Sequence, residues 1–135
     1  MKIVLDTNVL LQAVSARNAL RPIFEAVLDG KVELAISTEI LLEYEELLFR
    51  HRSEPEAARL SRFLRLAPNI LVHEPHYRFG LIKADPDDNK FVDCYLAANA
   101  DYLISNDRHF GDLSAAGFPA VRVVSAVAFL ELLAS

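Results

Sequence analysis

A short apolar segment that ends in three polar residues opens the chain and constrains its fold more than any other feature. Lys2–Leu5 is rich in branched residues, long enough for a buried strand and too short for a helix. Asp6, Thr7 and Asn8 follow, and a second apolar run begins at Val9. This order puts a carboxylate at the C-terminal end of a strand, the edge where ligands bind in open α/β sheets. A helix N-cap is the alternative role for these residues, although a cap needs only one of the three.

Apolar periodicity predicts that helices and strands alternate along the rest of the chain. Further strands are expected at Val32–Ile36, Ile70–Val72, Tyr102–Ile104 and Val121–Val124. Helices are expected from Val9 to about Arg17, and at Leu20–Leu28, Glu39–Arg50, Pro55–Ala67, Asp88–Asn99 and Ala126–Leu133. Strands that alternate with helices form a parallel sheet covered on both faces. The fold class is therefore α/β, and residues 1–135 are expected to form one domain because no linker or repeat interrupts them.

Composition places the chain among globular proteins of the reducing cytoplasm. Hydrophobic residues make up 53% of its 135 residues, which is enough for a sizeable core. It has no apolar run of the roughly 18 residues that a membrane span needs, and Asp6 comes too early for a signal peptide. The lone cysteine, Cys94, cannot form an internal disulfide. We expect it to be a small buried apolar residue.

The net charge of −5 argues against binding nucleic acid by bulk attraction alone. A nuclease is still compatible with it, because carboxylates that hold metal ions add to the negative charge. Arg59, Arg62 and Arg65 repeat at every third position of one predicted helix. They form either a solvated face or a rim that contacts phosphates. His73 and His76 flank a proline, which favours a loop over a zinc-binding helix.

Four acidic residues from four separate segments are predicted to lie at one edge of the sheet. Asp6 and Asp107 each follow a strand, and Glu43 lies one turn into a helix that follows another. Glu43 borders the apolar stripe of that helix and could equally be a solvated side chain, as Glu45 is expected to be. Asp88 is one of three acids where the next helix begins, a position that helix capping also explains. Three like charges so close together nevertheless repel unless a cation offsets them.

Carboxylates gathered in this way are typical of a site for a hard divalent cation. Mg²⁺ and Mn²⁺ prefer oxygen ligands. A bound cation can activate a water molecule and stabilise the charge that builds on a phosphate during in-line attack. The sequence has no Ser, Cys or His constellation typical of covalent catalysis. It therefore predicts hydrolysis by metal-activated water.

Four motifs in series resemble the PIN-domain ribonucleases, in particular the toxins of VapC-type toxin–antitoxin pairs. They are VLDTNVL, EILLEYEELL, DPDDNKFVDCYLAANADYLISND and ISNDRHF, and together they span nearly the whole chain. The resemblance implies a three-layer α/β/α sandwich, an acidic Mg²⁺ or Mn²⁺ site and cleavage of single-stranded RNA. It also implies an antitoxin partner that covers the acidic site, with an arginine placed among the carboxylates, and a homodimer.

Carried over by position, the family's catalytic and metal-binding acids fall on Asp6, Glu43, Asp88 and Asp107. Asn8 and Ser105 match the polar residues that support them. The stretch DPDDNKFVD also offers Asp85, Asp87 and Asp93; Asp88 fits the family's spacing best. Asp93 lies more than one turn further along the predicted helix and is a second candidate for the metal site.

Two other classes of protein remain to be distinguished from a ribonuclease. One is a catalytically silent PIN scaffold that only binds RNA or a partner protein, and failure to bind Mn²⁺ would favour it. The other is a phosphotransfer protein of the haloacid dehalogenase or receiver type, which also has an aspartate at a strand end. A haloacid dehalogenase needs a second aspartate two residues after the first, and this chain has Asn8 at that position. A receiver domain needs paired acids at the end of the first strand, and this chain has only Asp6 there.

Overall fold

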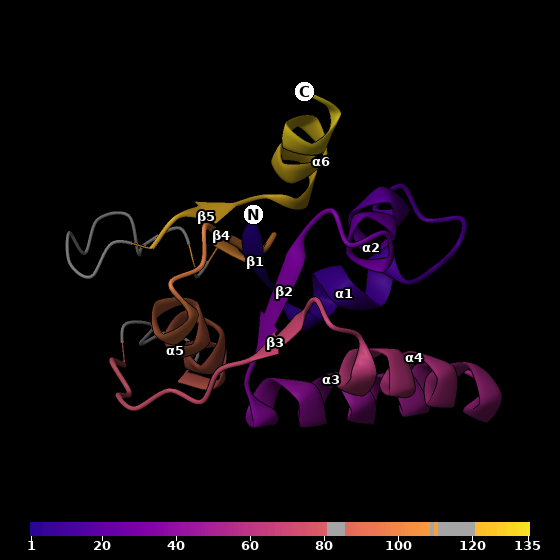
Figure 1. The fold of residues 1–135 in the computed structure, drawn as a ribbon, viewed down its shortest axis with the longest axis horizontal. Helices are drawn as coiled ribbons and strands as arrows, with labels where there is room; N and C mark the ends of the chain where they lie inside the picture. The colour runs from indigo at the N-terminus through magenta and orange to yellow at the C-terminus, as the bar shows by residue number, and fades with distance from the viewer. Residues whose placement is uncertain (81–85, 109, 111–120) are drawn as a thin grey trace.

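A five-stranded parallel sheet forms the centre of the molecule (Figure 1). The structure is a computed structural model, and it describes residues 1–80, 86–108, 110 and 121–135. The strands are β1 (Lys2–Leu5), β2 (Glu33–Ile36), β3 (Ile70–Val72), β4 (Tyr102–Ile104) and β5 (Val123–Val124). Their order across the sheet is β3-β2-β1-β4-β5, and each neighbouring pair is parallel. The parallel sheet expected from the alternating pattern is confirmed.

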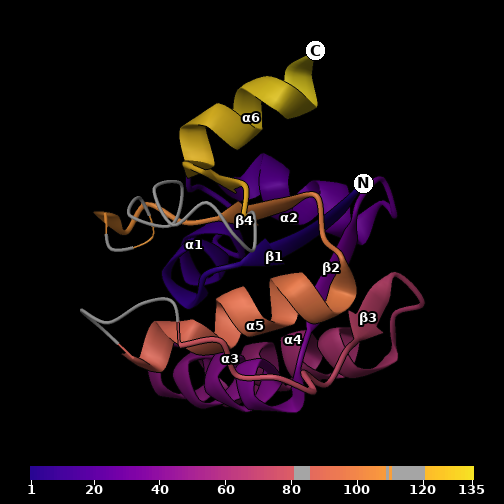
Figure 2. The same ribbon diagram turned by 90° about the vertical axis from the view of Figure 1, so that its left-hand side faces the viewer.

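Helices cover both faces of this sheet, so the expected three-layer α/β/α sandwich is also confirmed. They are α1 (Thr7–Ala13), α2 (Arg21–Leu28), α3 (Thr38–His51), α4 (Glu54–Leu66), the short 3-10 helix η1 (Pro86–Asp88), α5 (Asn89–Ala98) and α6 (Ala126–Ala134). One layer contains α5, which packs across β1, β2 and β4. The opposite layer contains α1 and α2, to the right of the sheet in Figure 1. The helices α3 and α4 pack against each other in the lower part of both views (Figures 1 and 2).

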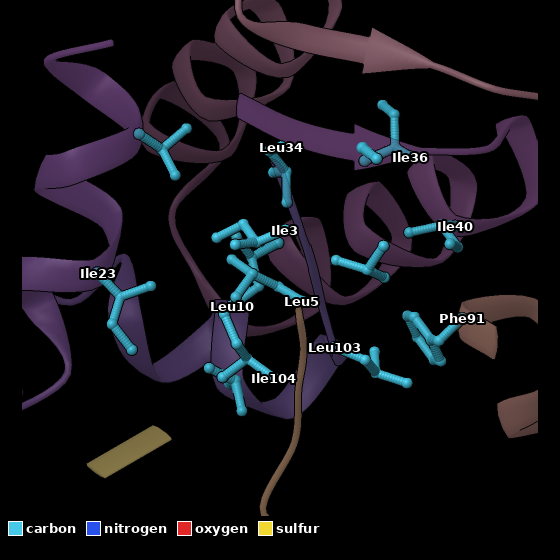
Figure 3. Packing of buried hydrophobic residues seen from close by; sticks show 14 of the residues in the cluster. Ile3, Leu5, Leu10, Ile23, Leu34, Ile36, Ile40, Phe91, Leu103 and Ile104 are labelled. Atoms are coloured by element: carbon cyan, nitrogen blue, oxygen red, sulfur yellow. The ribbon is translucent and has the colours of Figure 1, made fainter. Parts of the chain in front are cut away.

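The first strand lies in the middle of the sheet and of the core. Ile3, Val4 and Leu5 are fully buried, and β1 pairs with β2 on one side and with β4 on the other. Figure 3 shows Ile3 and Leu5 surrounded by apolar side chains of the neighbouring strands and of several helices. A strand buried on both faces must be apolar throughout. This requirement explains why Lys2–Leu5 is an uninterrupted apolar run after its first residue.

Short polar signals set several of the helix boundaries. Ser37, Ser53 and Ser125 are the N-caps of α3, α4 and α6, and each side-chain oxygen accepts a backbone N–H of the first turn. The Asp29-Gly30 turn ends α2 as expected, and Gly30 has a positive φ of 73° that suits glycine.

Cys94 is fully buried, as expected. None of the helices in the described ranges has the length and apolarity to cross a bilayer.

Two predicted elements are shorter in the structure. The first helix ends at Ala13, so Arg17 lies outside it, because the chain turns through the hydrogen bonds of Ser15 and Asn18. The last strand contains only Val123 and Val124, which are in register with Leu103 and Ile104 of β4, while the preceding Arg122 contributes a carbonyl oxygen to the Leu103 N–H without being part of the strand. Residues 73–80 contain neither helix nor strand, which confirms the loop expected around His73 and His76. Part of the turn expected after Asp107 lies outside the described residues.

Glu45 is not the solvated side chain that the helical pattern suggested. Its carboxylate accepts hydrogen bonds from Arg65 Nε and Nη2, both at 2.6 Å, and from the Ser61 hydroxyl. The pair links α3 to α4 and lowers the pKa of Glu45, chiefly through the hydrogen bond with Arg65. Of the three arginines at every third position of α4, Arg65 is therefore engaged with a carboxylate. The solvated-face interpretation is wrong for Glu45 because α4 packs against it, and only 14% of its side chain is exposed.

Replacing Glu45 with glutamine is expected to lower the melting temperature at neutral pH by about 1–3 °C, because Arg65 is half exposed and solvent screens the pair. A carboxyl group whose pKa is lowered by folding stabilises the fold above its ordinary pKa of about 4.5 and loses that contribution as the pH falls. Thermal melts at pH 7 and pH 3 should therefore show a difference that becomes smaller at the lower pH. Glu46→Gln, which removes the exposed pair with Arg50, is the matched control and should have a smaller effect. An equal or larger difference at pH 3 would contradict the ion pair.

Candidate functional site

The candidate site lies where the sheet changes the direction of its connections. From β1 the chain passes through α1 and α2 to reach β2, and it returns through α5 to reach β4 on the other side of β1. In open α/β sheets such a switch point opens a crevice at the carboxyl ends of the strands. Asp6 directly follows β1, and Ser105 directly follows β4. The Asp6 backbone N–H donates to the Ile104 carbonyl oxygen at 3.0 Å, which fixes the two strand ends side by side.

The Ser105 hydroxyl connects two of the predicted acids. It donates to Asp6 Oδ2 at 2.8 Å, and its oxygen accepts the backbone N–H of Asp107 at 3.0 Å. Asp6 and Ser105 are both buried. Asp6 occupies the N-cap position of α1 without a side-chain capping hydrogen bond, although the Asn8 backbone N–H lies close enough to its carboxyl group to oppose the rise in pKa that burial causes. The structure therefore brings Asp6 together with the turn that carries Asp107, as the repeated strand-to-acid pattern predicts.

A pocket of about 390 Å³ opens next to these residues. Its polar lining consists of Asp6, Asn8, Gln12, Asn106 and Asp107. Asn8 is exposed at the start of α1, where it can reach a molecule in this pocket. The lining thus combines one buried carboxylate, one partly exposed carboxylate and several amide groups, all of which offer oxygen ligands.

The electrostatic environment of Asp6 shows that other acids lie close to it. Burial raises the pKa of Asp6 most strongly, while the Ser105 hydroxyl and the nearby backbone N–H of Asn8 oppose that rise. The negative charges of Asp107 and Glu43 raise the pKa of Asp6 further. Acids from β1, from α3 and from the turn after β4 therefore repel one another in this region, and a cation would relieve that repulsion.

Glu43 reaches the same region but is already engaged through both carboxylate oxygens. Oε1 lies 2.9 Å from Lys90 Nζ, and Oε2 accepts the hydroxyl of Thr7. Lys90 belongs to α5 and is buried, whereas Glu43 is partly exposed. The Lys90 ammonium also donates to the Asp87 carbonyl oxygen at 2.7 Å. The alternative that Glu43 is an ordinary solvated side chain is therefore wrong.

The remaining candidates come from the stretch that leads into α5. Asp88 is partly buried and occupies the N-cap position of α5, two residues before Lys90. Asp93 is buried elsewhere: its Oδ1 accepts the Phe79 backbone N–H at 3.1 Å, and it lines a separate pocket with residues 72–77 and 79. The structure thus does not bring Asp93 to the Asp6 pocket. Asp85 lies outside the described residues, and the Asp87 side chain is exposed.

The residues at this site carry the oxygen ligands that a divalent cation binds, but the described side chains do not converge on one point. Carboxylate and amide oxygens are the ligands that Mg²⁺ and Mn²⁺ prefer, and the mutual repulsion at Asp6 is the expected sign of such a site. Within the described residues, however, no three acidic, histidine or cysteine side chains converge as they would around a metal ion. The Glu43 carboxylate instead contacts Lys90 and Thr7.

The comparison with known families agrees with this geometry. The sequence profile of the PIN domain family matches residues 2–109, which include every one of the predicted site residues. The chain belongs to the PIN domain family. No curated protein sequence matches the chain.

Several solved structures share this fold. VapBC2 from Rickettsia felis, bound to a DNA fragment from its promoter, and VapBC-1 from nontypeable Haemophilus influenzae each superpose on this PIN domain with a TM-score of 0.63 and 16% identity. The matches cover 93% and 94% of this chain, and 98% and 99% of those chains. FitAcB from Neisseria gonorrhoeae has a TM-score of 0.56 and 18% identity over 93% of this chain and 98% of the other. At these identities the likeness concerns the fold.

Sequence patterns did not single out two residues that hold this site together. Lys90 stands in the middle of an acidic stretch, and periodicity gives no sign that its ammonium turns inward toward Glu43. Thr7 was recognised only as part of the polar triplet after β1, yet its hydroxyl is bound to Glu43 of α3. A basic residue in the first turn of a helix whose start carries three acids is the signal that could have identified Lys90.

Proposed function

We propose that this PIN domain is a metal-dependent endoribonuclease that hydrolyses phosphodiester bonds of single-stranded RNA. The observation that carries this proposal is the hydrogen-bonded connection from Asp6 through Ser105 to the Asp107 turn, at the carboxyl ends of adjacent strands. This connection supports the proposal that acids from distant parts of the chain lie together in one pocket. Glu43 and Asp88 are the proposed further members of the set, and Asn8 and Ser105 support it.

Asp6, Glu43, Asp88 and Asp107 would hold Mg²⁺ or Mn²⁺. When bound, the cation supplies an activated water molecule and neutralises charge at the scissile phosphate. The protein's own residues position the site. Ser105 fixes the orientation of Asp6 through its hydroxyl hydrogen bond, and Asn8 offers its amide to a ligand in the pocket. Since the chain carries a net charge of −5, local contacts must bind the RNA backbone more than bulk attraction does.

We further propose that the protein is the toxin of a toxin–antitoxin pair. The motifs resemble VapC-type toxins, and the similar solved folds belong to proteins named VapBC2, VapBC-1 and FitAcB. A partner of this kind would cover the acidic pocket, and an arginine would offset the carboxylates in a charge-assisted pair. A homodimer is the oligomeric state that the resemblance implies, and the cytoplasm is the proposed compartment.

The direct test is cleavage of a labelled single-stranded RNA by the purified protein. We expect cleavage with Mg²⁺ or Mn²⁺, loss of cleavage in EDTA, and recovery when the metal is restored. Calorimetric titration with Mn²⁺ should detect binding independently of the choice of RNA. An absence of both cleavage and Mn²⁺ binding would overturn the proposal.

The second candidate function is a catalytically silent PIN scaffold that binds RNA or a partner protein. One observation favours it: Lys90 already neutralises Glu43, so part of the acidic set is satisfied without a metal ion. RNA binding that is unchanged by EDTA, together with no Mn²⁺ binding, would support this candidate.

A further inference from the structure

A buried lysine at the start of α5 is the most unusual charged group near the site. Only 8% of the Lys90 side chain is exposed, and lysine is rarely buried without a partner. Its ammonium has Glu43 Oε1 at 2.9 Å and the Asp87 carbonyl oxygen at 2.7 Å, and it lies 5.2 Å from the centre of the Phe91 ring. Removing a lysine from water is costly unless such partners compensate it. Its inward position is therefore stabilised by Glu43 above all.

The carboxylate of Glu43 links three elements through this contact. Glu43 is on α3, Lys90 is on α5 and Thr7 is on α1, so the two oxygens of one carboxylate join helices from both layers. The charge of Glu43 is also felt at Asp6, which places it beside the pocket. Each carboxylate oxygen can accept more than one bond, but a metal ion at Oε1 would meet the Lys90 ammonium, which lies 2.9 Å from that oxygen and repels another cation.

We infer that Lys90 is the resident counter-cation of the acidic site and competes with a divalent cation for Glu43. Without metal, the ammonium neutralises Glu43 and limits the repulsion among the acids. When a metal ion binds, Glu43 leaves Lys90, and the positive charge of Lys90 weakens the binding of that ion. Lys90 is thus a positioning residue that sets the metal affinity of the site. This inference rests on the proposed function.

The test compares wild type, Lys90→Met and Lys90→Arg. Methionine keeps most of the length and the apolar contacts of lysine but removes the charge. In EDTA, Lys90→Met should melt roughly 5–10 °C below wild type, because Glu43 loses its counter-charge. Its Mn²⁺ dissociation constant should be lower by about tenfold or more, since a nearby positive charge is removed. Saturating Mn²⁺ should therefore recover most of the lost melting temperature, which a defect in packing alone would not allow.

Two control variants test whether the result depends on the charge at position 90. Lys90→Arg keeps the charge and should bind Mn²⁺ within about threefold of wild type. Arg50→Met removes an equally charged side chain from the exposed pair with Glu46 and should change neither the melting temperature by more than about 2 °C nor the Mn²⁺ affinity. An equal or weaker Mn²⁺ affinity in Lys90→Met, with wild type binding normally, would overturn the competition alone. No Mn²⁺ binding by any variant would overturn the proposed metal site as well.

A measurement on wild type keeps the inference testable if Lys90→Met does not fold. The side-chain ammonium signal of Lys90 in ¹⁵N NMR should be protected from solvent exchange in EDTA, when Nζ is bonded to Glu43. Saturation with Mg²⁺ should shift or broaden that signal, because Glu43 leaves Lys90. A Lys90 signal that is unchanged at saturating Mg²⁺ would overturn the competition.

Discussion

Replacing Asp6 with asparagine is expected to reduce RNA cleavage by at least about a thousandfold, which corresponds to about 4 kcal/mol of activation free energy. Asp6 is the buried acid at the centre of the proposed site, between the end of β1 and the turn that carries Asp107. An asparagine has nearly the same shape and can still accept the Ser105 hydroxyl, but it lacks the charge that a divalent cation requires. The measurement is the single-turnover rate on a labelled single-stranded RNA in Mn²⁺.

The fold of the Asp6→Asn variant should survive this change. Burial and the neighbouring acids raise the pKa of Asp6, so its ionised form costs stability at neutral pH. In EDTA the variant should therefore melt at or above the wild-type temperature. Asp29→Asn, in the exposed turn between α2 and β2, is the matched control and should retain full activity. Full activity in Asp6→Asn, with contaminating nuclease excluded, would contradict the proposed site, and a much lower melting temperature in EDTA would contradict the repulsion.

The sequence was sufficient for the features that depend on local pattern. The apolar run at Lys2–Leu5 predicted a strand buried on both faces, and the strand-to-acid pattern repeated at Ser105 predicted that two strand ends would meet. Serine caps mark where three of the helices begin, and capping depends only on residues within one turn. The lengths of α1 and β5 were less predictable, since they depend on turns and on the short length of the neighbouring strand.

The pairing of charged side chains could not be read from the sequence. Glu45 and Glu43 are two residues apart on α3, yet one pairs with Arg65 of α4 and the other with Lys90 of α5. Which of them faces which helix depends on how α4 and α5 pack, and that is a property of the tertiary structure. For the same reason, Asp93 was a candidate for the metal site until the structure placed it against the Phe79 backbone.

Replacing Leu5 with alanine is expected to have the opposite effect to Asp6→Asn, although the two residues are adjacent. Leu5 is fully buried in the central strand, and its carbonyl oxygen accepts the hydroxyl of the buried Tyr44. Large-to-small changes at such positions cost about 2–5 kcal/mol. For a chain of this size that corresponds to a melting temperature roughly 8–20 °C lower. Below the transition, the folded fraction should still cleave RNA within about tenfold of wild type, because the side chain of Asp6 is intact.

Leu42→Ala is the matched control for this variant, because Leu42 of α3 is 55% exposed and its truncation should change the melting temperature by no more than about 2 °C. Thermal melts and activity measured on the same samples separate the two roles: a core residue sets how much protein is folded, and a site residue sets how fast the folded protein reacts. If Leu5→Ala melted like Leu42→Ala, β1 would not be the centre of the core. If Leu5→Ala lost activity as completely as Asp6→Asn while still folded, the position of the Asp6 carboxylate would depend on packing beneath it as well as on Ser105.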